Sequence, residues 1–161
     1  MPFKVKKKSA GYDSNSAALN LISYRARSER EIRDKLAERN FDAEEIEKTV
    51  KWLKGYGYLN DEQFAKDLSS SRVRVKSWGP LKIRQELSHK GLSSDHIQDA
   101  LGDYDESLQL ETSTEAMEKW LRKKGYSPPL DEKERNKAIL YLKSRGFTGD
   151  IIIKTVKKFS E

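Results

Sequence analysis

The chain contains no cysteine, only two histidines and four prolines, and no long apolar run. Without cysteine it can form neither a disulfide framework nor a thiolate zinc site, and it has no thiolate nucleophile. No apolar segment approaches the ~20 residues that a membrane-spanning helix needs. The basic start of the chain is not followed by the apolar core of a signal sequence. We therefore expect a cytoplasmic protein that does not enter the membrane.

Large apolar residues are also scarce, whereas charge is abundant. Leu, Ile, Val and Phe together supply 35 of the 161 residues, and 36% of the chain is charged, with 32 Lys and Arg against 26 Asp and Glu. Globular domains usually carry about 25% charged residues. This composition favours thin layers of helices with long solvated faces over a single thick core.

Helical periodicity dominates the chain, and alternating β-branched runs are nearly absent. The predicted helices cover about 14–26, 28–39, 42–54, 61–76, 80–90, 93–101, 106–124, 131–145 and 148–159. These nine helices fall into three groups of three, so we expect an all-α protein.

A set of six positions, five apolar and one basic, recurs three times along the chain. The sets are Ile32, Leu36, Arg39, Phe41, Ile46 and Val50, then Ile83, Leu87, Lys90, Leu92, Ile97 and Leu101, then Ala138, Leu142, Arg145, Phe147, Ile152 and Val156. Each copy has an apolar pair at i and i+4, a short break, and a second such pair. The repeat predicts three-helix units at 14–57, 58–103 and 104–161, preceded by a disordered basic arm at 1–13.

Each break carries the same local signals. A residue that tolerates the left-handed end of a helix comes first, then an apolar residue, then an N-cap, and then an apolar residue four positions later. The apolar pairs are Phe41 and Ile46, Leu92 and Ile97, and Phe147 and Ile152. This arrangement predicts a hydrophobic staple that fixes the angle between the two helices of each break.

Tyr56 and Tyr58 lie between the first and second predicted units, beside two glycines. They could face solvent as ligands or wedge adjacent units together. We favour the wedge, because aromatic residues beside glycine turns usually cover a junction.

No pattern of catalytic or metal-binding residues stands out. His89 and His96 lie on either side of a helix break without acidic ligands at metal-site spacing, so they are expected to be surface residues. The acidic run from Asp95 to Asp105 lacks the glycine and terminal glutamate of a calcium loop. There is also no glycine-rich phosphate loop, and we expect no cofactor, no metal and no enzymatic activity.

Positive charge is concentrated in one run that surrounds Trp78. The run contains Arg72, Arg74, Lys76, Lys82, Arg84 and Lys90, opposed by Glu86 alone. A second cluster, Lys119, Arg122, Lys123 and Lys124, ends the helix predicted over 106–124. Both suit a phosphate backbone or an acidic protein groove, and the alternative for each is a solvated helix face.

Three-helix units with a break before the third helix also suggest helix-turn-helix DNA readers. However, the third helices of the first two units begin with carboxylates, such as Asp42, Glu44 and Glu45. Phosphates would repel these groups, so reading of the major groove is disfavoured.

Several segments closely resemble the RecX family, bacterial regulators of the RecA recombinase. These are 58–64 (Tyr-Leu-Asn-Asp-Glu-Gln-Phe), 71–74 (Ser-Arg-Val-Arg), 79–87 (Gly-Pro-Leu-Lys-Ile-Arg-Gln-Glu-Leu) and 90–92 (Lys-Gly-Leu). Segment 28–36 resembles the first unit of that family, and 145–147 resembles the third. The resemblance is most specific in the second unit and weaker in the first helix of the third.

The resemblance implies three tandem three-helix repeats in an elongated, curved array without catalytic residues. Family members lodge in the groove of the RecA–DNA filament and inhibit its ATP hydrolysis, strand exchange and SOS induction, and some bind DNA directly. The resemblance also implies that Arg72, Arg74, Lys82, Arg84 and Gln85 contact the partner, with Lys76 and Trp78 in the same run. Charge alone adds Lys90, Arg122 and Lys123.

We therefore expect a monomer that binds the RecA filament, with single- or double-stranded DNA as a further partner. The alternative is a helical-repeat protein that binds DNA independently of sequence. A third, more remote hypothesis is a helical scaffold for an unrelated acidic protein.

Overall fold

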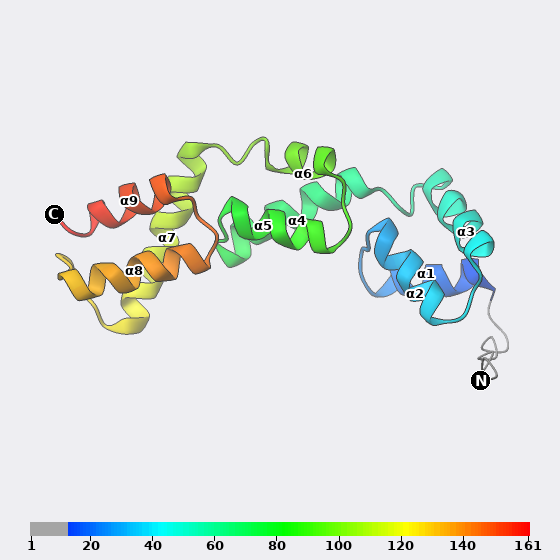
Figure 1. The fold of residues 1–161 in the computed structure, drawn as a ribbon, viewed down its shortest axis with the longest axis horizontal. Coiled ribbons are helices and arrows are strands. Elements are labelled where there is room, and N and C mark those ends of the chain that lie inside the picture. Colours follow the sequence, from blue (N-terminus) through cyan, green and yellow to red (C-terminus); the bar gives the residue numbers. More distant parts are fainter. Residues whose placement is uncertain (1–12) are drawn as a thin grey trace, which may run out of the picture.

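The computed structural model describes residues 13–161, and over these residues it contains nine α-helices and no strand (Figure 1). The helices are α1 (Ser14–Tyr24), α2 (Glu29–Glu38), α3 (Ala43–Gly55), α4 (Asp61–Lys76), α5 (Pro80–His89), α6 (Ser94–Leu101), α7 (Glu106–Lys124), α8 (Glu132–Ser144) and α9 (Gly149–Lys158). All nine lie within two residues of their predicted bounds, and the all-α prediction is confirmed. The basic arm predicted at 1–13 lies outside the described residues except for Asp13, the N-cap of α1.

Short polar side chains fix where most of the helices begin. Seven N-cap side chains accept a hydrogen bond from the backbone N–H three residues later, which satisfies a donor that the first turn leaves free. They are Asp13, Ser28, Asp42, Asn60, Ser93, Asp105 and Asp131. The helix α5 instead starts with Pro80 directly after Gly79.

The core consists of three separate clusters, one in each triplet of helices: α1–α3, α4–α6 and α7–α9. Every apolar residue of the repeated six-position set is buried, with exposed fractions from 0% at Ile32 to 9% at Leu101. Leu59 packs in the cluster of the first triplet and Tyr104 in that of the second, although each follows the predicted boundary. The boundaries themselves stay a prediction.

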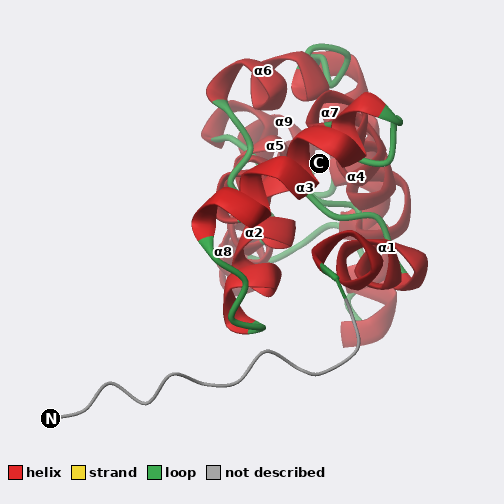
Figure 2. Ribbon diagram, turned by 90° about the vertical axis from the view of Figure 1, so that its right-hand side faces the viewer, coloured by secondary structure: helices red, strands yellow, loops and turns green. Residues whose placement is uncertain are grey.

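The three triplets lie in a row, with α1 and α9 at opposite ends of an elongated molecule (Figure 1). Viewed along that row, the triplets project over one another (Figure 2). The helix pairs in closest contact all belong to the same triplet. Neighbouring triplets therefore meet through small contacts, which we call the first joint (α1–α3 with α4–α6) and the second joint (α4–α6 with α7–α9).

At both joints the N-terminus of the middle helix of one triplet meets the C-terminus of the middle helix of the next triplet. At the first joint, the Ser28 hydroxyl before α2 donates to the carbonyl of Lys90 after α5, with 2.6 Å between the oxygens. At the second, the N–H of Gly79 before α5 donates to the carbonyl of Arg145 after α8, at 2.8 Å. Each contact satisfies carbonyls that a helix end leaves free and brings opposite ends of two helix dipoles together.

Candidate functional site

The predicted contact residues centre on the turn between α4 and α5. Ser77 ends α4 in the left-handed conformation (φ 51°), and the Trp78 N–H donates to the carbonyl of Arg72 at 3.2 Å. The hydroxyl of Tyr104 donates to the Trp78 carbonyl at 2.8 Å. Burial raises the pKa of that hydroxyl to about 12, so it remains a donor throughout the neutral range. Both backbone polar groups of Trp78 are therefore hydrogen-bonded, which fixes the backbone of the turn.

Two of the predicted cations flank this ring. The guanidinium of Arg72 lies 5.4 Å from the centre of the Trp78 ring, and the ammonium of Lys82 lies 4.5 Å from it. Both distances fall within the range of cation–π attraction. The structure thus brings Arg72, Trp78 and Lys82 together from α4, the turn and α5.

Arg72 is already paired within its own triplet. Its Nε and Nη2 atoms each donate to a carboxylate oxygen of Glu86, both at 2.6 Å. The side chains are 24% and 21% exposed, so the pair is partly shielded from water. Hydrogen bonding to Glu86 raises the pKa of Arg72. This bidentate pair ties α4 to α5, and it neutralises one charge of the basic run.

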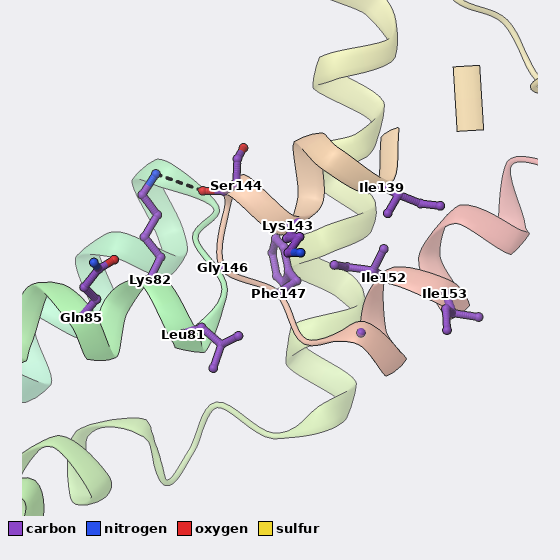
Figure 3. A pocket seen from close by; sticks show the side chains of 11 residues that line it. Leu81, Lys82, Gln85, Ile139, Lys143, Ser144, Gly146, Phe147, Ile152 and Ile153 are labelled. Atoms are coloured by element: carbon purple, nitrogen blue, oxygen red, sulfur yellow. Dashed lines mark hydrogen bonds between the residues drawn. The ribbon is translucent and has the colours of Figure 1, made fainter. Parts of the chain in front are cut away.

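Lys82 takes part in the second joint. Its ammonium donates to the Ser144 carbonyl at 3.3 Å (Figure 3). The N–H of Leu81 donates to the Gly146 carbonyl at 3.0 Å. The guanidinium of Arg145 returns a bond to the Lys76 carbonyl at 3.1 Å. Lys82 therefore helps to set the position of the third triplet against the second.

Lys90 plays the corresponding part at the first joint. Its ammonium donates to Glu31 at 3.1 Å, while Arg25 donates to the same carboxylate at 2.7 Å. Burial acts to raise the pKa of Glu31, but bonds from Arg25, the Ser28 N–H and Lys90 together lower it to about 2. Glu31 therefore stays ionised and holds the joint at any pH near neutrality.

The other predicted residues of the run are exposed. Arg74, Lys76 and Arg84 form no ion pair with any carboxylate of residues 13–161, and Gln85, which follows Arg84 on α5, is also exposed. Arg74 lines a hollow between α4 and α6 that Asp99 and Asp103 also line. These cations are available to a partner in a way that Arg72 is not.

Arg122 and Lys123 lie elsewhere, in the last turn of α7. Both are exposed, and they belong to the third triplet rather than to the surroundings of Trp78. Their position next to Gly125, which ends α7 with a φ of 70°, is where cations stabilise a helix terminus. The two predicted basic clusters are thus separate sites.

The interpretation of Tyr56 and Tyr58 as a wedge between units is wrong. Their exposed fractions are 71% and 52%, and both rings pack on Trp52 of the preceding helix α3, with centroids at 5.4 and 6.3 Å. The glycines next to them let the chain turn after α3 without burying either ring. The contact between the first two triplets is instead made by the polar groups around Glu31.

Residues 13–161 offer neither a metal-binding cluster nor a membrane-spanning helix. Within this part of the chain, no group of three or more His, Asp or Glu side chains is placed to hold a metal ion. None of the helices described is both long and apolar enough to cross a membrane.

One feature of the second joint is absent from the sequence predictions. An open groove lies between α5 and the α8–α9 pair, lined by Leu81, Ile139, Phe147, Ile152 and Ile153 (Figure 3). Lys82 and Gln85, two predicted contact residues, line its α5 side. The three consecutive isoleucines of α9 are the one sequence signal that could have indicated it, since one helix face cannot bury all three.

Two family models match this chain. The model described as "RecX, first three-helix domain" matches residues 16–53, and that described as "RecX, second three-helix domain" matches residues 60–101. The matched ranges cover α4–α6 completely and nearly all of α1–α3.

Curated relatives named "Regulatory protein RecX" match most of the chain. The protein of Chlorobaculum tepidum is 37% identical over 151 residues, which cover 94% of this chain and 89% of the relative. That of Bacillus pumilus is 35% identical over 141 residues, which cover 88% of this chain and 53% of the relative. The chain thus spans about half the length of some curated relatives that it matches, and nearly all of another.

Two solved structures share this fold. The crystal structure of RecX from Lactobacillus salivarius has a TM-score of 0.80 at 27% identity and covers 91% of this chain and 94% of its own. A second structure, described as regulatory protein RecX, has a TM-score of 0.77 at 27% identity and covers 90% of this chain and 70% of its own. The arrangement of three triplets in a row is therefore shared with these proteins.

Proposed function

The chain belongs to the RecX family of regulatory proteins, and from this premise we propose that it binds the RecA–DNA filament and inhibits its activities. These activities are ATP hydrolysis, strand exchange and SOS induction. The protein acts without catalytic residues or cofactor, as a monomer in the cytoplasm. Its effect comes from binding alone.

The observation that carries the proposal is the unpaired charge on the second triplet. Arg74, Lys76 and Arg84 have no carboxylate partner among residues 13–161, and they lie on α4 and α5, the two helices that the Trp78 turn connects. Exposed cations such as these, on the last turn of α4 and on α5, contribute little to folding but attract phosphates and acidic protein surfaces. An elongated array offers such a surface to an extended polymer along its whole length.

The basic run thus divides into two roles. Arg72, Lys82 and Lys90 hold the second triplet together and join it to its neighbours. Arg74, Lys76, Arg84 and Gln85 are left to contact the filament. Arg122 and Lys123 are secondary contacts at most, because they lie in a different triplet.

Reversal of charge at Arg74 and Arg84 tests this proposal. We expect the Arg74→Glu/Arg84→Glu variant to inhibit RecA-driven ATP hydrolysis at least about tenfold less well, because opposed charges weaken a complementary interface. Its melting temperature should stay close to that of the parent, since neither side chain forms an ion pair within residues 13–161.

The Arg122→Glu/Lys123→Glu variant is the matched control, with the same change of charge on exposed residues of another triplet. It should inhibit nearly as well as the parent. Full inhibition by the Arg74/Arg84 variant at physiological salt would show that this surface is only a solvated face.

The alternative function is DNA binding independent of sequence, and the same exposed cations, Arg74, Lys76 and Arg84, would then contact phosphates. For phosphate contacts on single strands, log K falls by about 0.7 per contact for each unit of log salt concentration, so three contacts give a slope of about −2. Binding to bare DNA with this slope, without any gain from RecA, would favour the alternative. A shallower slope, together with a requirement for RecA on the DNA, would support the filament.

A further inference from the structure

The groove at the second joint has a volume of about 750 Å³ and an apolar floor. Phe147 and Ile152 form the buried part of that floor, with exposed fractions of 2% and 5%. Leu81 from α5, Ile139 from α8 and Ile153 from α9 line its sides (Figure 3). Each of the three helices around the joint therefore contributes an aliphatic side chain.

The aliphatic residues on the sides of the groove are exposed to solvent, and packing within the fold does not require them there. Leu81 is 53% exposed and Ile153 is 67% exposed. In α9, Ile151 and Ile152 fill the core, and Ile153 is turned by a further ~100° to the surface. Single exposed aliphatic residues are common, but aliphatic residues from three helices around one hollow are typical of a binding site.

The charge at the groove has one sign. Lys82 and Lys143 are its only charged lining residues, and neither forms an ion pair with a carboxylate of residues 13–161. An occupant must therefore bring apolar side chains for the floor and negative charge for the rim.

Two occupants from the chain itself do not meet this requirement. Residues 1–12 contain Lys4, Lys6, Lys7 and Lys8 and no acidic residue, so their charge opposes that of the rim. The acidic stretch from Asp95 to Asp105 in a second copy also fails, because its Ile97 and Leu101 are buried in its own core. Nucleic-acid bases fit poorly as well, since the exposed lining is aliphatic and its one aromatic ring, Phe147, is only 2% exposed and cannot serve as a stacking platform.

We propose that this groove binds an amphipathic, acidic segment of a protein partner, with apolar residues at helical spacing on one side and carboxylates on the other. In taking the recombinase as that partner, the proposal rests on the proposed function. The groove then supplies specificity for protein, while the exposed cations of the second triplet supply attraction for phosphate. Because its sides come from two triplets, an occupant would also fix the second joint.

A photo-crosslinking experiment tests this directly. The chain has no cysteine, so Ile153→Cys provides a single thiol that a photoreactive maleimide can label. The control is Leu140→Cys, because Leu140 is equally exposed (66% against 67%) but lies outside the groove, on α8. The probe is RecA-coated single-stranded DNA, and mass spectrometry identifies the crosslinked partner.

We expect the Ile153→Cys protein to crosslink RecA about fivefold more than the control, at a segment rich in Asp and Glu, as groove docking requires. A crosslink to DNA, to a second copy of the chain, or at the control level would overturn the proposal. Matched melting temperatures show that both labelled proteins are folded. The unlabelled parent is assayed in parallel, and its failure to remain on the filament would instead refute the proposed function.

Discussion

At the scale of single residues, the second joint depends on two glycines. A Cβ at Gly79 would overlap the backbone of Gly146, and a Cβ at Gly146 would overlap Lys82. Gly146 also has a φ of 88°, a conformation that side-chain-bearing residues rarely adopt. Because backbone meets backbone here, the two triplets can approach closely enough for the Gly79 and Leu81 N–H groups to bond across the joint.

We expect Gly146→Ala to destabilise the protein by clearly more than Gly125→Ala. Both glycines have positive φ, at 88° and 70°, so either substitution lowers the free energy of unfolding by about 1–2 kcal/mol through backbone strain alone. Only at Gly146 does the new Cβ meet another residue, whereas at Gly125 it would have nothing within 4 Å. Denaturant unfolding measures both, and equal losses would contradict this account of the joint.

Glu31 gives the first joint a predicted dependence on pH. Its pKa falls from 4.5 to about 2 in the folded chain, so the stabilisation is complete above pH 4.5 and is lost as the pH falls toward 2. At pH 7 we expect Glu31→Gln to lower the free energy of unfolding by about 1–2 kcal/mol. This is less than the full pKa shift implies, because solvent screens the carboxylate.

Thermal melting across this pH range is the measurement. The difference between parent and Glu31→Gln should shrink steadily from pH 4.5 to pH 2. Glu44→Gln is the control, since Glu44 is 79% exposed and, among residues 13–161, pairs with Lys48 of its own helix. A Glu31→Gln difference that stays constant with pH would refute the role of this carboxylate.

At the scale of helices, the staple in each triplet fixes one helix against the next. Phe41, Leu92 and Phe147 have exposed fractions of 7%, 7% and 2%, and their partners four residues beyond the N-cap are also buried. The residue before each of them, Asn40, Gly91 or Gly146, has positive φ. The break thus reverses the chain while keeping both apolar residues of the staple in the core.

Phe41→Ala and Leu92→Ala should each cost about 2–5 kcal/mol, the range for removal of a large side chain from a core. Circular dichroism during thermal melting provides the test. Leu140→Ala serves as the control, because Leu140 is 66% exposed and its truncation should change stability by less than about 0.5 kcal/mol. Unchanged melting of both staple variants would disprove the structural role of the staples.

At the scale of the whole molecule, the three cores are separate and the joints are small and polar. Stability in such an array is approximately the sum of local terms for each unit and each interface. The molecule should therefore respond to local damage locally, unlike a domain with one continuous core.

Hydrogen exchange of the Phe41→Ala variant examines this expectation. Backbone amides of α1–α3 should exchange faster than in the parent, whereas those of α7–α9 should keep their protection, because two joints separate them from the altered core. Leu92→Ala, in the second triplet, should shift the effect to α4–α6. A uniform loss of protection across all nine helices described would show that the array unfolds as one unit.

The helices, their caps and the buried repeat could be predicted from the sequence, because these features depend on residues three to five positions apart. The Ser28 cap, the Gly79–Pro80 start and the staple pairs are of this kind, and the resemblance to the RecX family rests on the same short segments. The use of each cation could not be predicted, because its partner lies far away in the chain: Lys90 meets Glu31, and Lys82 meets Ser144.

Only the tertiary structure decided which members of the basic run are free and which hold the joints. It also placed Tyr56 and Tyr58 on Trp52 instead of between triplets, and it gathered Leu81, Ile139 and Ile153 around one groove. The physical reason is that periodicity specifies which face of a helix is buried, whereas the approach of two triplets depends on backbone contacts such as that between Gly79 and Gly146. Local sequence determined the parts, and the joints between them determined the surface that a partner meets.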